Sequence, residues 1–161
     1  MEQKILRILE KDGRATAKEI ASELSLEEKE VERIIADLEE RGVIGGYKAM
    51  INWNKYDENL VSALIELKVT PQLDQGFDRV AEKIYQFEHV KNVYLMSSGA
   101  YDLSVMIEGR NLKEVAGFVA EKLAPMECIT STSTHFILKR YKEGGIVYEA
   151  EKEDGRQVIE F

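Results

Sequence analysis

The sequence predicts an α+β chain in which an N-terminal helix-turn-helix unit precedes a sandwich of β-α-β-β-α-β order. Two observations support this fold class. Two helix-start motifs lie close together near the N-terminus, and the spacing of apolar residues changes from helical to alternating near Leu60. The chain has 161 residues, of which 44% are hydrophobic and 32% charged, a length and composition that suit two small globular domains.

The two helix-start motifs are the capping boxes Thr16–Glu19 and Ser25–Glu28. In such a box the hydroxyl accepts a hydrogen bond from the backbone N–H three residues later, and the glutamate accepts one from the N-cap N–H. We therefore predict one helix that ends near Leu24 and a second that starts directly after it. So short a connection is typical of a helix-turn-helix.

Apolar residues at helical spacing predict that three helices share one small core. The first helix runs over about Glu2–Glu10 and stops at Asp12-Gly13. The inward positions of the next two helices are Ile20, Ala21, Leu24, Val31, Ile34, Ile35 and Leu38. Gly42 then ends the helical region, and Val43–Ile51 is predicted to be extended, as a wing or a linking strand. We assign residues 1–59 to this domain.

From Val61 onward apolar and polar residues alternate, which predicts a strand that Pro71 ends. The elements predicted after it are a helix over Phe77–Phe87, strands over Val90–Met96 and Leu103–Ile107, a helix over Leu112–Leu123 and a strand over Ile129–Leu138. This order is that of a ferredoxin-like sandwich with two helices on one face of an antiparallel sheet, over residues 60–142. We expect the other face to be apolar and to be covered by a second copy, which predicts a homodimer.

The C-terminal residues 143–161 are predicted to add a β-hairpin. Its arms would be Ile146–Ala150 and Gln157–Phe161, joined around Asp154-Gly155. The alternative is a disordered acidic tail.

Composition excludes several classes of protein. One cysteine rules out an internal disulfide, and two isolated histidines have no zinc-site spacing, so no metal or cofactor is predicted. No apolar run is long enough to span a bilayer and no signal-peptide core is present, so we expect a cytoplasmic protein without a membrane partner. No arrangement of nucleophile, base or paired carboxylates indicates catalysis.

Lys29 and Arg33 lie on the outward face of the second helix of the helix-turn-helix, opposite its apolar stripe. At i and i+4 they are candidates for contact with bases or phosphates of double-stranded DNA in the major groove. The alternative is a solvated face with local ion pairs to Glu32 or Asp37. Because this helix is acidic and the chain carries a net charge of −8, we expect a single copy to bind DNA weakly and with strong salt dependence.

Further candidates for DNA contact flank these helices. Thr16 and the backbone N–H groups of Ala17 and Lys18 stand at a helix N-terminus, which attracts a phosphate, although plain capping explains the same residues. Arg14 and Lys48 are candidates for phosphate contact from the entry loop and the wing, or are simply exposed charges.

Several ordered motifs resemble the leucine-responsive/asparagine (Lrp/AsnC, feast-famine) family of transcription regulators. They are Lys4-Ile5-Leu6, Glu10-Lys11-Asp12-Gly13-Arg14, Glu19-Ile20-Ala21, Leu38 to Tyr47, and Gly99 to Leu103 after Val93. The resemblance covers residues 1 to about 142. It implies a winged helix-turn-helix joined to an ACT-like domain that dimerises and assembles further, typically into octamers, with a small amino-acid-like effector bound between dimers.

The same resemblance places effector contacts in a loop and on the last strand of the ACT-like domain. By position these are Gly99, Tyr101, Asp102, Thr130, Thr132 and Thr134. Asp102 is suited to an ammonium group, or else it accepts hydrogen bonds from its own turn. The three threonines share one side of a strand by a period of two, although threonine is also a common strand former.

Two other functions are open at this stage. Similar two-part proteins act as sirohaem decarboxylases, in which His89 or His135 would have to reach a tetrapyrrole. Alternatively, the chain is an ACT-like assembly module whose acidic helix-turn-helix no longer binds DNA.

Overall fold

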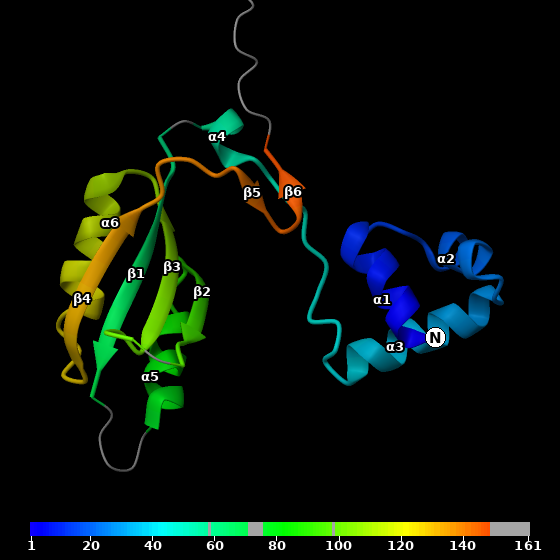
Figure 1. Cartoon of the computed structure of the whole chain (residues 1–161), viewed down its shortest axis with the longest axis horizontal. Helices are drawn as coiled ribbons and strands as arrows, with labels where there is room; N and C mark the ends of the chain where they lie inside the picture. The colour runs from blue at the N-terminus through cyan, green and yellow to red at the C-terminus, as the bar shows by residue number, and fades with distance from the viewer. Residues whose placement is uncertain (58, 71–75, 98, 149–161) are drawn as a thin grey trace, which may run out of the picture. The chain divides into compact units, whose positions relative to one another are not determined.

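The computed structural model describes residues 1–57, 59–70, 76–97 and 99–148 (Figure 1). It divides into two compact units, with the division between Ile51 and Asn52. This division falls earlier than the boundary predicted between residues 59 and 60, because the short helix α4, Trp53–Tyr56, groups with the second unit.

The first unit is built from helices α1 (Glu2–Lys11), α2 (Ala17–Leu24) and α3 (Glu28–Glu40). Their buried side chains form one core, as the apolar spacing predicts. Its members are Ile5, Leu9, Ile20, Ala21, Val31, Ile34 and Leu38. Arg41 ties the two outer helices, because it pairs with Asp37 at 2.6 Å and with Glu2 at 3.1 Å.

The capping box at Thr16 is confirmed, whereas the one at Ser25 is wrong. Glu19 donates its backbone N–H to the Thr16 hydroxyl at 3.2 Å and accepts from the Thr16 N–H at 2.8 Å. Ser25 instead ends α2 in the left-handed conformation, with φ of 54°. An N-cap residue needs extended backbone, and Glu27 rather than Ser25 has it at the start of α3. The Glu27 side chain makes no capping hydrogen bond.

The segment predicted as a wing or linking strand, Val43–Ile51, contains no strand, although the structure describes every residue in it. A strand needs a partner strand, and no other strand belongs to this unit within the described chain. The segment is held to the helices by its own contacts. The backbone N–H groups of Val43 and Ile44 both bond to Leu38 O, and the Tyr47 hydroxyl donates to Glu39 Oε1 at 3.0 Å.

The second unit contains the predicted sandwich. Its elements are β1 (Val61–Val69), α5 (Gly76–Tyr85), β2 (Val90–Leu95), β3 (Leu103–Gly109), α6 (Leu112–Phe118), a π-helical continuation η1 (Val119–Leu123) and β4 (Ile129–Phe136). The strands form one antiparallel sheet in the order β2-β3-β1-β4, with the helices on one face (Figure 1). The helix expected to run unbroken to Leu123 thus changes hydrogen-bonding pattern at Val119.

The core of the second unit lies between the helices and the sheet. In β1 the buried side chains are Ala63, Ile65, Leu67 and Val69. Val80 and Ile84 of α5 and Val115 of α6 pack on the same side.

The uncovered face of the sheet is not the apolar surface that we expected. Residues that alternate with the buried positions of β1 and β3 point to this face, and they are Ser62, Leu64, Glu66, Lys68, Ser104, Met106 and Glu108. Most of them are polar or charged. The two apolar residues among them, Leu64 and Met106, form a cross-strand pair.

A short hairpin follows the sandwich, with β5 (Lys142–Glu143) paired to β6 (Ile146–Val147). Arg140 anchors it, because its guanidinium donates to Ser62 Oγ at 2.5 Å and pairs with Glu108 at 3.2 Å and Glu143 at 3.3 Å. The sequence did not predict this hairpin, whose second strand uses Ile146 and Val147, the start of the predicted first arm. Residues 149–161, which include the predicted turn and second arm, lie outside the described residues. Among the described residues, every helix is too short or too polar to cross a membrane.

Candidate DNA-binding and effector-binding sites

The outer face of α3 presents Lys29 and Arg33 to solvent. Both side chains are exposed, and in the part of the chain that the structure describes neither makes an ion pair. Asp37, which we considered as a partner for Arg33, is occupied by Arg41 at 2.6 Å. The local ion pairs of the alternative interpretation are therefore absent from this face, and both cations remain available for a phosphate or a base edge.

The N-terminus of α2 is already occupied in part by a side chain of the protein. Glu19 accepts from both the backbone N–H and the hydroxyl of Thr16, at 2.8 Å each, and these bonds lower the pKa of Glu19. A fixed negative charge thus stands beside Thr16. Lys18 is exposed on the first turn and is better placed than the Thr16 hydroxyl to meet a phosphate.

Arg14 and Lys48 belong to two segments that meet in the first unit. The Arg14 backbone N–H donates to Asp12 Oδ1 at 2.9 Å, which fixes the turn before α2. A Cβ at Gly13 would lie 3.7 Å from the ring of Tyr47, the residue before Lys48. The turn before α2 and the predicted wing therefore come close together at Gly13 and Tyr47. Arg14 and Lys48, the next residue in each segment, are both exposed.

In the second unit, the Asp102 carboxylate joins the ends of two neighbouring strands. Its Oδ2 accepts from the backbone N–H of Val69 at 2.8 Å, and its Oδ1 pairs with Lys68 Nζ at 3.3 Å. The Val69 N–H is the main cause of a lowered pKa at Asp102, and Lys68 adds to it. The alternative that Asp102 accepts hydrogen bonds from its own turn is therefore wrong, because the donor is the backbone N–H of Val69 in strand β1.

Backbone hydrogen bonds close the loop that carries Gly99 and Tyr101. Met96 N–H donates to Asp102 O at 2.8 Å, and Asp102 N–H donates to Leu67 O at 2.9 Å. Gly99 has φ of +125°, which strains any other residue, and Tyr101 is half-buried.

The three predicted threonines of β4 do not share one side. Thr132 and Thr134 stand opposite the buried Leu67 and Ile65, so they point to the helix-covered face. A bulge beside Lys68 and Val69 inserts one extra residue before Ser131, which breaks the period of two. Thr130 lies at this bulge, where its hydroxyl donates to Lys68 O at 3.3 Å.

Lys68 was not among the predicted site residues, yet it lies between Asp102 and Thr130. Its side chain is 44% exposed and belongs to the uncovered face of the sheet. The alternation in β1 placed Lys68 on that face, but only the strand order β3-β1-β4 shows which side chains flank it.

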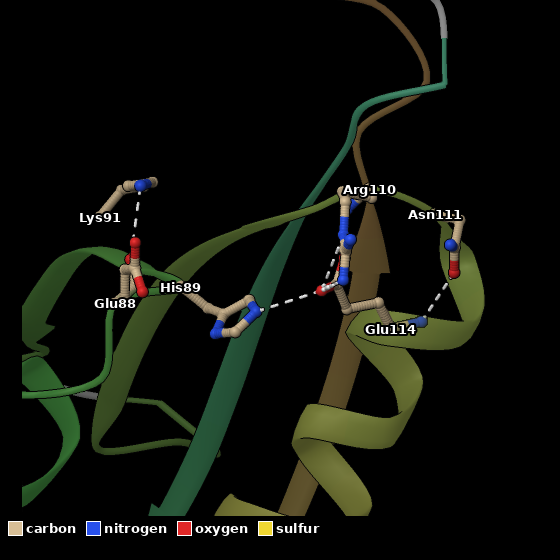
Figure 2. Close-up of polar contacts among 6 residues, drawn as sticks. All are labelled: Glu88, His89, Lys91, Arg110, Asn111 and Glu114. Atoms are coloured by element: carbon tan, nitrogen blue, oxygen red, sulfur yellow. Dashed lines mark hydrogen bonds and ion pairs between the residues drawn. The ribbon is translucent and has the colours of Figure 1, made fainter.

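The two histidines lie on opposite faces of the sandwich. His89 contacts α6, where its Nε2 lies 3.4 Å from Glu114 Oε1 (Figure 2). The His89 ring also lies 5.5 Å from the ring of Phe118. His135 stands opposite Leu64 on the uncovered face and pairs with Glu66 at 3.0 Å. The hypothesis of a tetrapyrrole enzyme needs His89 or His135 to reach the ligand, and the positions of these two rings do not favour it.

A helix-turn-helix with unpaired cations on its outer helix, followed by a separate sandwich with a charged loop, defines a class of protein: DNA-binding regulators that respond to a small ligand. The comparisons agree with this class. Residues 1–44 match the family described as winged helix-turn-helix DNA-binding, and residues 62–147 match the Lrp/AsnC ligand binding domain. The chain belongs to the Lrp/AsnC family of transcription regulators.

Relatives match over nearly the whole chain. The uncharacterized HTH-type transcriptional regulator YugG of Bacillus subtilis is 48% identical, over 98% of this chain and 95% of that protein. The regulator LrpA of Pyrococcus horikoshii is 34% identical, over 86% of this chain and 94% of that protein. These relatives are named as regulators, not as enzymes.

Solved structures share the fold. The leucine response regulatory protein LrpA of Mycobacterium tuberculosis aligns with a TM-score of 0.76 and 22% identity, over 89% of this chain and 94% of that chain. The regulator NMB0573 of Neisseria meningitidis, solved as a complex with L-Met, aligns with a TM-score of 0.73 and 20% identity, over 88% and 90%.

Proposed function

We propose that this protein is a cytoplasmic transcription regulator whose α3 helix binds double-stranded DNA, and whose DNA affinity or assembly changes when an amino-acid-like effector binds the ACT-like domain. The observation that supports the DNA contact is that Lys29 and Arg33 are both exposed on the outer face of α3 and make no ion pair with any described residue. A ligand shifts such an assembly only by the difference in its affinity for the two arrangements. The L-Met complex of the Neisseria regulator supports an amino acid as the class of effector.

We also propose that the protein forms homodimers that assemble further, into octamers. The acidic flanks of α3 make a single half-site weak, since Glu30, Glu32 and Asp37 stand beside its two cations. Linking several helix-turn-helix units that each bind DNA weakly raises the overall affinity without any new contact.

The substitution Arg33→Ala tests the DNA contact. We expect operator affinity to fall by about tenfold, the loss typical of one charged contact to DNA, with no change in oligomer size. Affinity is measured by gel shift on a DNA site that the unmodified protein selects from a random-sequence library, and size by sedimentation velocity.

Arg79→Ala is the matched control. It removes the same charge from an exposed position of α5 in the other unit, so operator affinity should stay unchanged. Equal affinity of Arg33→Ala and the unmodified protein would contradict the α3 assignment. Failure to retain any specific site, even at low salt, would favour an assembly module that no longer binds DNA.

A further inference from the structure

Glu32 is an exposed carboxylate beside the two candidate DNA-contacting cations of α3. On the surface of a helix, Lys29 has Glu32 at i+3 and Arg33 at i+4 as its neighbours. In the part of the chain that the structure describes, no ion pair or hydrogen bond holds the Glu32 carboxylate. The carboxylate is therefore available to a group outside this chain.

Glu32 lies on the side of α3 that faces the predicted wing. Residues seven apart share one side of a helix, since seven residues make almost two full turns. Glu39, seven residues after Glu32, accepts from the Tyr47 hydroxyl at 3.0 Å, and Tyr47 directly precedes the candidate phosphate contact Lys48. Glu32 also belongs to the N-terminal half of α3, the part of a recognition helix that contacts base edges.

The nearby carboxylate Glu30 lies on the opposite side of the helix. Asp37, seven residues after it, pairs with Arg41 at 2.6 Å, and Arg41 also pairs with Glu2 of α1 at 3.1 Å. This side of α3 is thus turned toward the N-terminal end of α1. Because Glu30 is as exposed as Glu32, it provides a matched control for the effect of charge alone.

A carboxylate only accepts hydrogen bonds, whereas phosphates and most polar groups in the major groove are acceptors as well. The donors in that groove are the N4 amino group of cytosine and the N6 amino group of adenine, and adenine carries its N7 acceptor beside the amino group. Cytosine is therefore the base that a carboxylate matches. Its pairing partner, guanine, offers the N7 and O6 acceptors that suit an arginine such as Arg33.

We propose that Glu32 accepts a hydrogen bond from the N4 amino group of a cytosine in each half-site and so helps to set the sequence that the protein prefers. This inference rests on the proposed DNA binding and adds a specificity-determining residue. At a site without an amino group in this position the carboxylate stays unpaired beside acceptors, which lowers affinity for that sequence. The acidic character of α3 then serves to reject wrong sites.

The test uses the full-length protein and duplexes that it selects from a random-sequence library. We expect the selected sites to share a preferred cytosine in each half-site. Each preferred cytosine is then replaced in turn by 2-pyrimidinone, which lacks the N4 amino group and leaves the partner guanine in place. By gel shift, one such replacement should weaken binding of the unmodified protein about tenfold or more. The same replacement should change binding of Glu32→Ala by less than about twofold.

Glu30→Ala is the matched control, since it removes the same charge from the other side of α3. It should raise the affinity for all duplexes to the same extent, because one charge that repels phosphates is gone. The effect of 2-pyrimidinone should remain as large in Glu30→Ala as in the unmodified protein.

The outcomes separate this inference from the function on which it rests. Selected sites without a preferred cytosine, or an equal effect of 2-pyrimidinone on Glu32→Ala and on the unmodified protein, would overturn the role of Glu32 and leave DNA binding standing. If the unmodified protein selects no duplex at all, even at low salt, the proposed DNA binding and the role of Glu32 fail together.

Discussion

Single carboxylates in this protein join segments that are distant in the chain. Glu114 is the strongest case, because it accepts from the backbone N–H of Arg110 at 2.5 Å, pairs with the Arg110 guanidinium at 3.2 Å and contacts His89 at 3.4 Å (Figure 2). Asn111 caps the same turn by accepting from Glu114 N–H at 2.9 Å. The end of β3, the start of α6 and the residue before β2 are thereby held together.

The pKa of Glu114 predicts how stability depends on pH. Donation from Arg110 lowers this pKa from its ordinary value of 4.5 to about 2. A depressed carboxyl pKa stabilises the folded state fully above about 4.5, and this contribution is lost as the pH falls to about 2. We therefore expect Glu114→Gln to lower the melting temperature at pH 7, with the difference shrinking below pH 4.5 and vanishing near pH 2.

Thermal melts followed by circular dichroism across this pH range provide the measurement. Glu121→Gln, at an exposed position of η1, removes the same charge and should show no comparable pH-dependent difference. A constant difference between Glu114→Gln and the unmodified protein at all pH values would show that the carboxylate charge is not what stabilises this turn.

For single residues, the element that carries a residue was easier to predict than the side chains and backbone groups that it contacts. The sequence indicated that Asp102 is a charged group in a loop, but its partners Lys68 and Val69 come from another strand and depend on register. The period of two predicted a common side for the threonines, and it failed at Thr130 because one inserted residue shifts the pattern. Lys68 itself gave no local signal, since an exposed lysine in a strand is ordinary.

Among the elements, every helix and strand of the two domain cores was predictable, because each buries an apolar stripe of its own period. The wrong predictions concern one helix start, one change of helix type and one segment that forms no strand. Ser25 matches an N-cap motif but ends the preceding helix, and Val119 begins a π-helical turn inside an apolar helical pattern. The predicted wing had strand-like residues but no partner strand within the described part of its unit.

The packing of α6 on β3 depends on Gly109. A Cβ at this position would lie 2.9 Å from Cγ2 of Val115, a buried core side chain. We expect Gly109→Ala to destabilise the protein by about 1–3 kcal/mol, the usual cost of overpacking a core. Urea unfolding at one protein concentration measures the change.

Gly117, which lies in α6 itself, offers a control for the same packing contact. A Cβ there meets nothing within 4 Å, so Gly117→Ala should stabilise the protein by roughly 0.5–1 kcal/mol through helix propensity. Equal and small effects of the two alanines would mean that α6 moves freely away from β3, against the close contact seen here.

At the scale of the whole molecule, the proposed assembly would reconcile the composition with the proposed function. A net charge of −8 opposes binding to a polyanion, and the two exposed cations of α3 offer little compensation in one copy. The uncovered sheet face is a candidate surface for pairing two copies. Its polar rows surround the apolar pair Leu64 and Met106, an arrangement of apolar centre and polar rim that is common in interfaces.

This arrangement predicts that one charge at the centre of the face disrupts both assembly and DNA binding. Leu64→Asp places an unpaired carboxylate against the second copy, whereas Leu112→Asp adds the same charge at an exposed first turn of α6, where a helix N-terminus tolerates it. We expect sedimentation velocity to show a smaller species only for Leu64→Asp, and operator affinity to fall by about a hundredfold or more as linked binding is lost. A folded Leu64→Asp variant that sediments like the unmodified protein would place the dimer contact elsewhere. A smaller species that still binds its operator tightly would show instead that one copy of α3 suffices, despite its acidic neighbours.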